Sequence, residues 1–405
     1  MLAQTFQGVS LYIADTRTLE NFCNRLVGTK VLAFDTEFMR ERTYYARLCL
    51  LQIASEDEVA AIDPFAVDDL SPLVPLLIDD RIQKVVHAGQ QDMEILFHAT
   101  GVSISPIFDT QVAATIAGFD CQMSYQSLVT NVLGVELDKS STYTDWARRP
   151  LSEAQIAYAL NDVRYLPGLY SELHARLISA GRLDWLSSDF ESMADPSAFI
   201  VDPDTMWRRV KRASSLNRRA LGVLQKVTAW RELEAQRRNI PRRWLLGDET
   251  LVEIARHAPQ DARSLSELRG VDNKLSNTVR EALLAAVSAG LQVQDADLPA
   301  FPRRRKAPAE ADGVVDLMAA LIRVRAKEHG VAQPVLATRE EIEALAAGDR
   351  EQSPLLQGWR RLLVGDDLLQ LLEGKLSLSI AEDRLCVTRT YEDAIGDIDD
   401  GTHLA

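Results

Sequence analysis

Four acids and a tyrosine, in three separate segments, are the residues whose types and spacing indicate chemistry. Asp35 and Glu37 lie two residues apart at the end of the apolar run VLAFDTEF. Because side chains of a strand alternate between its faces, both carboxylates would leave the same face. A buried acid is unfavourable without a cation or arginine partner. The pair therefore indicates either a metal site or an exposed pair on an edge strand.

The other three residues lie further along the chain. Asp92 stands in KVVHAGQQDMEIL, where a β-rich run breaks at Gly89 and a helix is expected to begin. An Asp there is also a common helix cap. In YALNDVRYL, Tyr158 and Asp162 are four residues apart and share one edge of a helix. A hydrogen bond between them at the margin of the core is the simpler alternative.

The acids are more informative as a set than singly. Mg²⁺ and Mn²⁺ prefer oxygen ligands, and three or four converging carboxylates can hold two such ions about 4 Å apart. Such a site suits phosphoryl transfer. His87 precedes Asp92 by five residues, but imidazole suits softer ions. A structural hydrogen bond at the end of the strand is the favoured role for His87.

Two unlike parts of the chain would position these residues. Up to about residue 110, β-rich runs alternate with helical stretches, which predicts an α/β domain with a central sheet. From about 110 to 180 the pattern is mainly helical. Apolar residues at spacings of three and four predict one long amphipathic helix through Ile156, Leu160, Val163 and Leu166.

The remainder is expected to be helical to its end, with linkers at 195–205 and 295–313. Its two halves resemble each other weakly. The segment from Arg231 can be laid over the segment from Arg323 at an offset of 91 or 92 residues. The agreement is mainly apolar spacing, so a repeat and chance similarity both remain open.

Composition limits the class of protein. The length of 405 residues predicts two to four domains, and 46% hydrophobic with 26% charged residues is typical of soluble globular proteins. No window has the uncharged apolar length of a membrane span. Charges throughout the first thirty residues argue against a secretory signal, which predicts a cytoplasmic protein. The four cysteines form no CxxC pair, so neither a local zinc knuckle nor a disulfide framework is expected.

Charge is segregated along the chain. The net charge is −14, yet residues 205–245 hold twelve Lys and Arg against two Glu, so the rest carries about −24. A basic block between acidic regions is typical of a surface that approaches polyphosphate. A solvated helix face is the alternative. The candidate nucleic-acid contacts in this block are Arg237, Arg238, Arg242 and Arg243.

The order DTE, HAGQQD and YALND resembles the three motifs of the DEDD superfamily of 3′→5′ exonucleases, whose fold is ribonuclease H-like. Tyr158, four residues before Asp162, matches the branch with tyrosine at this position. The longer strings FDTEFMRERTYYARLCLLQIA, KVVHAGQQDMEIL and FDTQVAA resemble the ribonuclease D family over roughly residues 10–180. Residues 210–290 look like the helical nucleic-acid-binding module named HRDC, and 313–380 like a degenerate second copy.

The resemblance implies a role for each acid at a site with two divalent metal ions, Mg²⁺ or Mn²⁺. Asp35 would bridge both ions. Glu37 and Asp162 would complete the ion that binds the attacking water, and Asp92 would support the other ion. Tyr158 would orient the water through its hydroxyl.

The implied architecture is an α/β ribonuclease H-like exonuclease domain, with a mixed central sheet flanked by helices, followed by two small all-α domains. The expected boundaries are 1–195 for the exonuclease domain and 206–294 for the first HRDC-type domain. The second, degenerate one would span 313–380. The acidic tail at 381–405 is expected to be flexible.

The implied activity is trimming of 3′ ends of precursor tRNA and other structured RNAs, with release of nucleoside 5′-monophosphates. The expected partner is RNA with a free 3′ end, with no membrane, no obligate protein partner and a monomeric chain. Lys139, Arg148 and Arg149 are candidate phosphate contacts, and Phe38 is either a stacking residue or, preferably, a core residue. A DNA-directed exonuclease and a noncatalytic nucleic-acid-binding scaffold are the alternatives.

Overall fold

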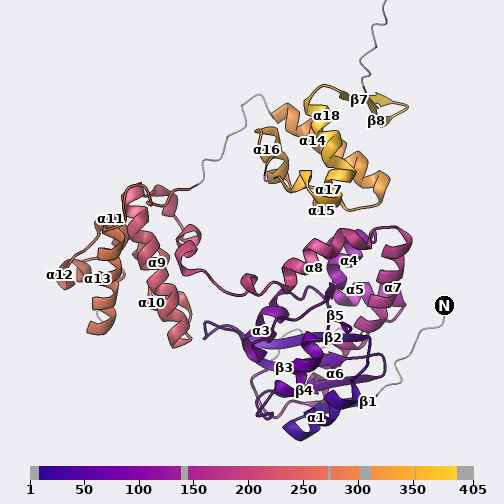
Figure 1. Cartoon of the computed structure of the whole chain (residues 1–405), viewed down its shortest axis with the longest axis horizontal. Helices are drawn as coiled ribbons and strands as arrows, with labels where there is room; N and C mark the ends of the chain where they lie inside the picture. The colour runs from indigo at the N-terminus through magenta and orange to yellow at the C-terminus, as the bar shows by residue number, and fades with distance from the viewer. Residues whose placement is uncertain (1–8, 138–144, 272–274, 302–311, 352, 390–405) are drawn as a thin grey trace, which may run out of the picture. The chain divides into compact units, whose positions relative to one another are not determined.

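The computed structural model describes residues 9–137, 145–271, 275–301, 312–351 and 353–389 (Figure 1). They form two compact units. The first contains the described residues up to 113 and from 124 to 301, and the second contains 114–123 and the described residues from 312 onward. Among the described residues, no helix is long and apolar enough to cross a membrane.

A six-stranded mixed sheet is the centre of the first unit, with strand order β1-β4-β3-β2-β5-β6. The pairs β1/β4, β2/β5 and β5/β6 are parallel, whereas β2/β3 and β3/β4 are antiparallel. The predicted mixed central sheet is therefore confirmed. The strands are β1 (Val9–Ile13), β2 (Val31–Met39), β3 (Arg47–Ala54), β4 (Glu58–Ile62), β5 (Gln83–Val86) and β6 (Ile107–Asp109).

Helices flank this sheet. They are α1 (Thr16–Arg25), α2 (Val74–Ile78), α3 (Gln90–Thr100), α4 (Thr110–Ile116), α5 (Tyr125–Leu133), α6 (Glu153–Arg164), α7 (Leu166–Ser179) and α8 (Ser187–Ala194). The long helix expected through Leu166 is in fact two helices, because α6 ends at Arg164 and α7 begins at Leu166. Pro167 in the first turn of α7 explains the break, since proline has no N–H to continue α6.

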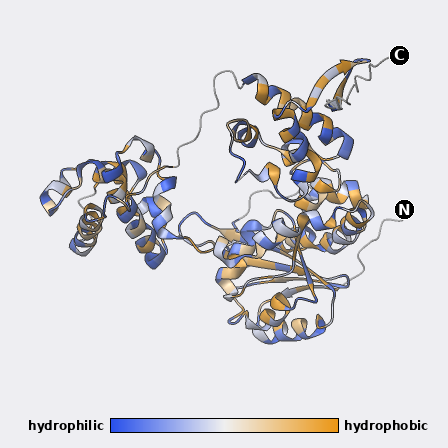
Figure 2. Cartoon of the chain, turned by 45° about the horizontal axis from the view of Figure 1, so that its top comes forward, coloured by the Kyte–Doolittle hydropathy of each residue, from blue (hydrophilic) through white to orange (hydrophobic). Residues whose placement is uncertain are grey.

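The two faces of β2 have different roles. Leu32 and Phe34 belong to the main apolar core, together with residues such as Phe22 of α1 and Met93 of α3. Figure 2 shows the central strands as largely hydrophobic. The alternate residues of β2, including Asp35, project to the opposite face, on which α6 packs. One strand therefore serves both the core and the site.

The rest of the first unit is helical. Its apolar core gathers Trp207, Leu224, Ile254 and Leu283. The backbones of α9 and α13 pass so closely that a Cβ on Gly290 would clash with Val223 Cα. Only glycine fits there. The helices are α9 (Arg218–Arg238), α10 (Arg242–Leu245), α11 (Asp248–His257), α12 (Ala262–Ser266) and α13 (Asn277–Leu291), preceded by the 3₁₀ turns η2 (Leu183–Leu186), η3 (Pro196–Ala198), η4 (Pro203–Arg209) and η5 (Ala213–Ser215).

The second unit contains helices and a hairpin. Its helices are α14 (Asp312–His329), α15 (Gln333–Leu336), α16 (Arg339–Ala346), α17 (Gly358–Arg360) and α18 (Asp366–Leu372), with a 3₁₀ turn η7 (Pro354–Leu356) and a π-helical turn η8 (Arg361–Gly365). Strands β7 (Leu376–Ala381) and β8 (Arg384–Arg389) pair antiparallel.

This hairpin corrects two expectations, that the chain is helical to its end and that residues from 381 are flexible. The alternation in LSLSIA is typical of a strand. The turn residues Glu382 and Asp383 both have positive φ, at 51° and 58°. Such a turn usually carries Asn, Asp or Gly, so Glu382 is not typical of its position in the turn. The tail from 390 lies outside the described residues.

Candidate active site

Three acids from two elements meet on the α6 face of the sheet. Carboxylate oxygens of Asp35 and Glu37 on β2 and of Asp162 on α6 all lie within 4.8 Å of one another. Asp35 and Glu37 share a face because strand side chains alternate, and the register of β2 shifts at a bulge directly after Glu37. The sheet and the helix thus bring together acids that are far apart in the chain.

Asp92 joins these acids from α3. It is 8% exposed and lies in the first turn of the helix, where Gly89, not Asp92, is the N-cap. Its carboxylate accepts a hydrogen bond from the Thr36 hydroxyl, on the residue between Asp35 and Glu37. Its charge contributes to raising the pKa of both Asp35 and Glu37. The capping alternative is therefore not what the structure shows.

The charges of the cluster strongly oppose one another. Burial first, and then the charges of Asp92, Asp162 and Glu37, raise the pKa of Asp35 well above its usual range. Burial followed by repulsion from Asp162 and Asp92 raises the pKa of Glu37 to about 8. Burial raises the pKa of Asp162 to about 7 and that of Asp92 to about 6. Acids held this way favour a positive partner, and an all-oxygen donor set fits hard divalent cations.

Tyr158 lies one helical turn before Asp162, and the two side chains are close enough to affect each other's pKa. Burial and then the nearby acids raise the pKa of Tyr158 to about 12. Its ring lies beside that of Trp146, with centroids 6.4 Å apart. The phenol therefore lies at the edge of the acid cluster.

Both ends of α6 are fixed. At its start, Ser152 and Gln155 form a reciprocal capping box. At its end, the Tyr125 hydroxyl of α5 donates to the Asn161 carbonyl at 2.8 Å and accepts from the Tyr165 N–H at 3.2 Å. Tyr125 was not identified from the sequence, since nothing local connects it with α6. Its contact holds the turn that carries Asp162.

Asp109 is the second positioning residue that the sequence did not reveal. It is 1% exposed, and its carboxylate accepts from the backbone N–H groups of Ala88, Gly89, Gln111 and Val112 at 2.8–3.3 Å. These bonds fix the turn between β5 and α3, in which Ala88 has a φ of +54°. The string FDTQVAA contained the signal, an acid directly after a short apolar strand.

His87 and Phe38 take their favoured structural roles. His87 Nδ1 lies 2.9 Å from Thr110 Oγ1, which in turn donates to the Val86 carbonyl at 3.0 Å. Phe38 packs against the main apolar core.

Arg149 has a role other than the expected phosphate contact. Its five N–H donors bind both carboxylate oxygens of Asp63 and the carbonyls of Cys49, Trp146 and Arg148 at 2.6–3.0 Å. An arginine has only five N–H groups. No N–H group of Arg149 remains for phosphate, so the expectation that Arg149 contacts phosphate is wrong. Arg148 is exposed, and Lys139 lies outside the described residues.

The basic block is partly neutralised within the chain. Arg237 and Arg238 both pair with Glu234, at 2.7 and 2.5 Å, and Arg242 pairs with buried Glu232 at 3.2 Å. Arg243 contributes to lowering the pKa of Asp248. These pairs support part of the solvated-face alternative, because each reduces the charge available to a polyphosphate.

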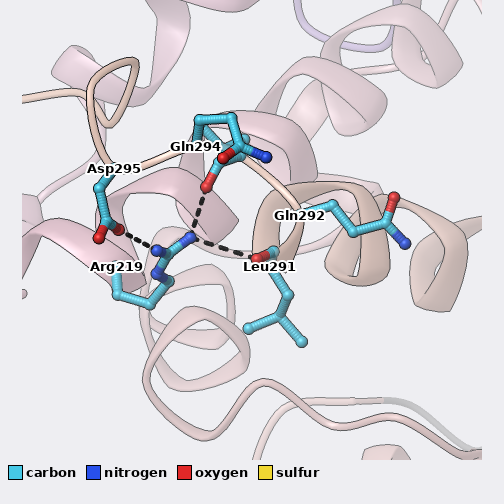
Figure 3. A pocket seen from close by; sticks show the side chains of 6 residues that line it. Arg219, Leu291, Gln292, Gln294 and Asp295 are labelled. Atoms are coloured by element: carbon cyan, nitrogen blue, oxygen red, sulfur yellow. Dashed lines mark hydrogen bonds and ion pairs between the residues drawn. The ribbon is translucent and has the colours of Figure 1, made fainter.

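A separate hollow in the helical part has no catalytic set of residues. Figure 3 shows its lining residue Arg219 bonded to Asp295 and to the Leu291 carbonyl, at 3.2 Å for the latter. A further bond joins Arg219 to the Val293 carbonyl at 2.5 Å. The arginine thus closes the end of α13, which is a structural role. The acids of the site do not line this hollow.

Two family models match the chain. Residues 11–178 match a 3′-5′ exonuclease domain and residues 220–287 match the HRDC domain. Ribonuclease D of Gluconacetobacter diazotrophicus is 43% identical over 370 residues, covering 91% of this chain and 94% of that protein. The chain belongs to the ribonuclease D family.

Further similarity supports this family assignment. Ribonuclease D of Sphingobium indicum is 41% identical over 382 residues, covering 93% of this chain and 98% of its own length. The crystal structure of ribonuclease D from Escherichia coli superposes with a TM-score of 0.76 at 30% identity, covering 90% of this chain and 98% of that one. That protein is described as an exoribonuclease involved in structured RNA processing. This member of the family is accordingly a hydrolase of the 3′→5′ exoribonuclease class.

Proposed function

We propose that this exoribonuclease trims the 3′ ends of precursor tRNA and other structured RNAs by hydrolysis with two divalent cations. The observation that carries the proposal is the convergence of Asp35, Glu37 and Asp162 within 4.8 Å, with Asp92 beside them. Processing of structured RNA by the Escherichia coli relative supports the substrate class.

The acids would divide the binding of the cations as the family resemblance implies. Asp35 would contact both ions, Glu37 and Asp162 one of them, and Asp92 the other. When bound, such cations supply positive charge for the phosphate oxygens and lower the pKa of water. Mg²⁺ and Mn²⁺ both suit the all-oxygen donor set.

Tyr158 would position the attacking water rather than deprotonate it. Because its pKa is raised to about 12, the phenol keeps its proton at neutral pH. It can therefore act as a hydrogen-bond donor and orient an oxygen atom beside Asp162, but it is a poor general base. In-line hydrolysis of the last phosphodiester would release a nucleoside 5′-monophosphate.

The decisive experiment is a time-resolved digestion of matched RNA and DNA strands with free or blocked 3′ ends, alongside a precursor tRNA with a 3′ extension. With Mg²⁺ or Mn²⁺ we expect stepwise shortening of free RNA ends to 5′-monophosphates, and none with EDTA. Preference for DNA would instead favour the repair or proofreading alternative.

Replacement of one acid tests the site itself. Asp35→Asn should lower kcat by at least about 10³-fold while RNA binding is retained, because the charge that is removed belongs to the ion site. Asp80→Asn, at an exposed acid of the same unit, is the matched control and should keep full activity. Unchanged activity in Asp35→Asn would remove the assigned site.

A further inference from the structure

Gln52 is a buried polar residue directly opposite Asp35. It lies on β3, is 0% exposed, and finds no hydrogen-bond partner among the described residues for either its Nε2 or its Oε1. Buried amides in native proteins nearly always have partners, because an unsatisfied polar group is unfavourable away from water. An unpaired amide in the middle of a central strand is therefore unusual.

The register of the sheet places this amide beside the acid cluster. Asp35 of β2 pairs with Gln52 of β3, and the same register pairs Glu37 with Leu50. Directly opposed residues of antiparallel strands project from the same face, with Cβ atoms about 4.5–5.5 Å apart. The neighbours Leu51 and Ile53 belong to the apolar core on the other face. Gln52 therefore lies on the face that carries Asp35 and is covered by α6.

The side chains that flank Gln52 leave Asp35 as a suitable hydrogen-bond partner for its amide. On its other side, Gln52 is paired with Ala61 of β4, which offers no polar side chain. Above it, the fully buried residues of α6 are apolar, namely Ala159 and Val163. An ionised carboxylate only accepts hydrogen bonds, and the amide NH₂ supplies two donors.

We propose that Gln52 is a positioning residue of the metal site, whose Nε2 donates a hydrogen bond to the Asp35 carboxylate when the acids hold divalent cations. This inference rests on the metal site of the proposed function. A charge-assisted hydrogen bond would fix the orientation of the acid expected to contact both ions. Residues that orient metal ligands in this way typically change metal affinity 10–100-fold when replaced.

The test compares Gln52→Met with the wild-type full chain. Met has similar length and no hydrogen-bonding amide, so the metal-free protein loses no bond and its Tm in EDTA should be unchanged or higher. Mn²⁺ affinity, measured without RNA by counting free Mn²⁺ with electron paramagnetic resonance, should fall about 10–100-fold.

A matched control separates this effect from general repacking. Thr228, on α9, is also fully buried with an unpartnered hydroxyl. Thr228→Val should likewise leave the Tm unchanged or higher, but it should retain wild-type Mn²⁺ affinity. Wild-type affinity in Gln52→Met would overturn the inference. A parallel loss of Tm and affinity would also overturn it, since it would show a structural role alone.

The side-chain amide resonances of Gln52, identified by their absence in Gln52→Met, provide a direct readout. A downfield shift of one amide proton on addition of diamagnetic Mg²⁺ is expected for a new bond to a carboxylate, whereas an unchanged position would contradict the donor role. If the wild-type chain bound no Mn²⁺, the proposed metal site would fail as well. Equal Mn²⁺ affinity of the wild type and Gln52→Met would contradict only the proposed role of Gln52.

Discussion

The acids of the site place several carboxyl groups close together and largely shielded from water. Burial and then repulsion from Asp162 and Asp92 raise the pKa of Glu37 to about 8, and burial raises that of Asp162 to about 7. Without cations, both therefore keep protons in the folded chain that they would release when unfolded. Such acids contribute fully to stability below about pH 4, and the contribution is lost as pH rises through about 7 to 8.

We therefore predict that the metal-free protein loses stability between pH 5 and pH 8. The amide of Glu37→Gln does not titrate, so this variant should lose less stability as the pH rises. Its free energy of unfolding at pH 8 should be higher than that of the wild type by about 1–3 kcal/mol. Denaturant unfolding in EDTA at several pH values measures both effects. Glu20→Gln, at an exposed glutamate of α1, is the control and should follow the wild type; a steeper slope in Glu37→Gln would contradict the argument.

Tyr158→Phe removes a hydroxyl beside the acid cluster while keeping the ring beside Trp146. Loss of water positioning should slow hydrolysis by roughly 10²-fold, with RNA affinity nearly unchanged. Single-turnover digestion and RNA titration separate the two quantities. A large loss of affinity with normal single-turnover chemistry would instead assign Tyr158 to substrate binding.

At the level of elements, the site depends on how strand and helix ends are anchored. The turn before α3 is held by one buried carboxylate, Asp109, which accepts four backbone N–H groups. That turn also requires Gly89, where a Cβ would lie 2.5 Å from the Val86 side chain. The orientation of Asp92 therefore depends on residues that do not take part in the chemistry.

Asp109→Asn should destabilise the protein by about 2–4 kcal/mol, because the amide NH₂ would face an N–H group and buried donors would lose their acceptor. Thermal and denaturant unfolding in EDTA measure the loss. Asp15→Asn is the matched change at the exposed N-cap of α1, where Asn caps about as well as Asp. Equal stability of the two variants would show that the Asp109 bonds are dispensable.

Across the whole molecule, the second unit repeats part of the first. Helices α9 and α14 end at Arg238 and His329, α10 and α15 begin at Arg242 and Gln333, and α11 and α16 begin at Asp248 and Arg339. Each pair is 91 residues apart, which agrees with the weak sequence repeat. This order of elements supports our proposal that residues 313–380 form a degenerate HRDC-like domain.

The basic block provides a prediction at the same scale. Reversing the charge of Arg237, Arg238, Arg242 and Arg243 should weaken RNA binding and make its salt dependence shallower, by about 0.7 in slope for each phosphate that the protein no longer neutralises. Because three of these arginines already pair with Glu232 or Glu234, we expect the change to be smaller than that of four fully available arginines. Titration over a range of salt concentrations measures the slope.

A control at the exposed residues Arg17 and Lys30 tests whether that effect is local. The variant with both charges reversed there should keep most of the RNA affinity and its slope. An unaltered slope in the four-arginine variant would show that the block is a solvated helix face.

The sequence by itself predicted the acids and the tyrosine of the candidate site, because the relations that mark most of them are local. The two-residue spacing of Asp35 and Glu37 on a strand, and the four-residue spacing of Tyr158 and Asp162 on a helix, follow from the geometry of one element. Short β-rich runs between helical stretches likewise predicted the sheet. Local spacing also predicted α6, but one proline moved its end.

Only the tertiary structure decided which distant groups meet. The pairing of Arg149 with Asp63 and the register that places Gln52 opposite Asp35 depend on contacts between separate segments. Two of the four N–H bonds of Asp109, those from Ala88 and Gly89, join turns that are about twenty residues apart, and only the fold brings these turns together. The β7/β8 hairpin was missed because the first residue of its turn, Glu382, is not of a type that usually adopts positive φ. Side-chain type and spacing fix what a residue can do, whereas packing fixes which partner it finds.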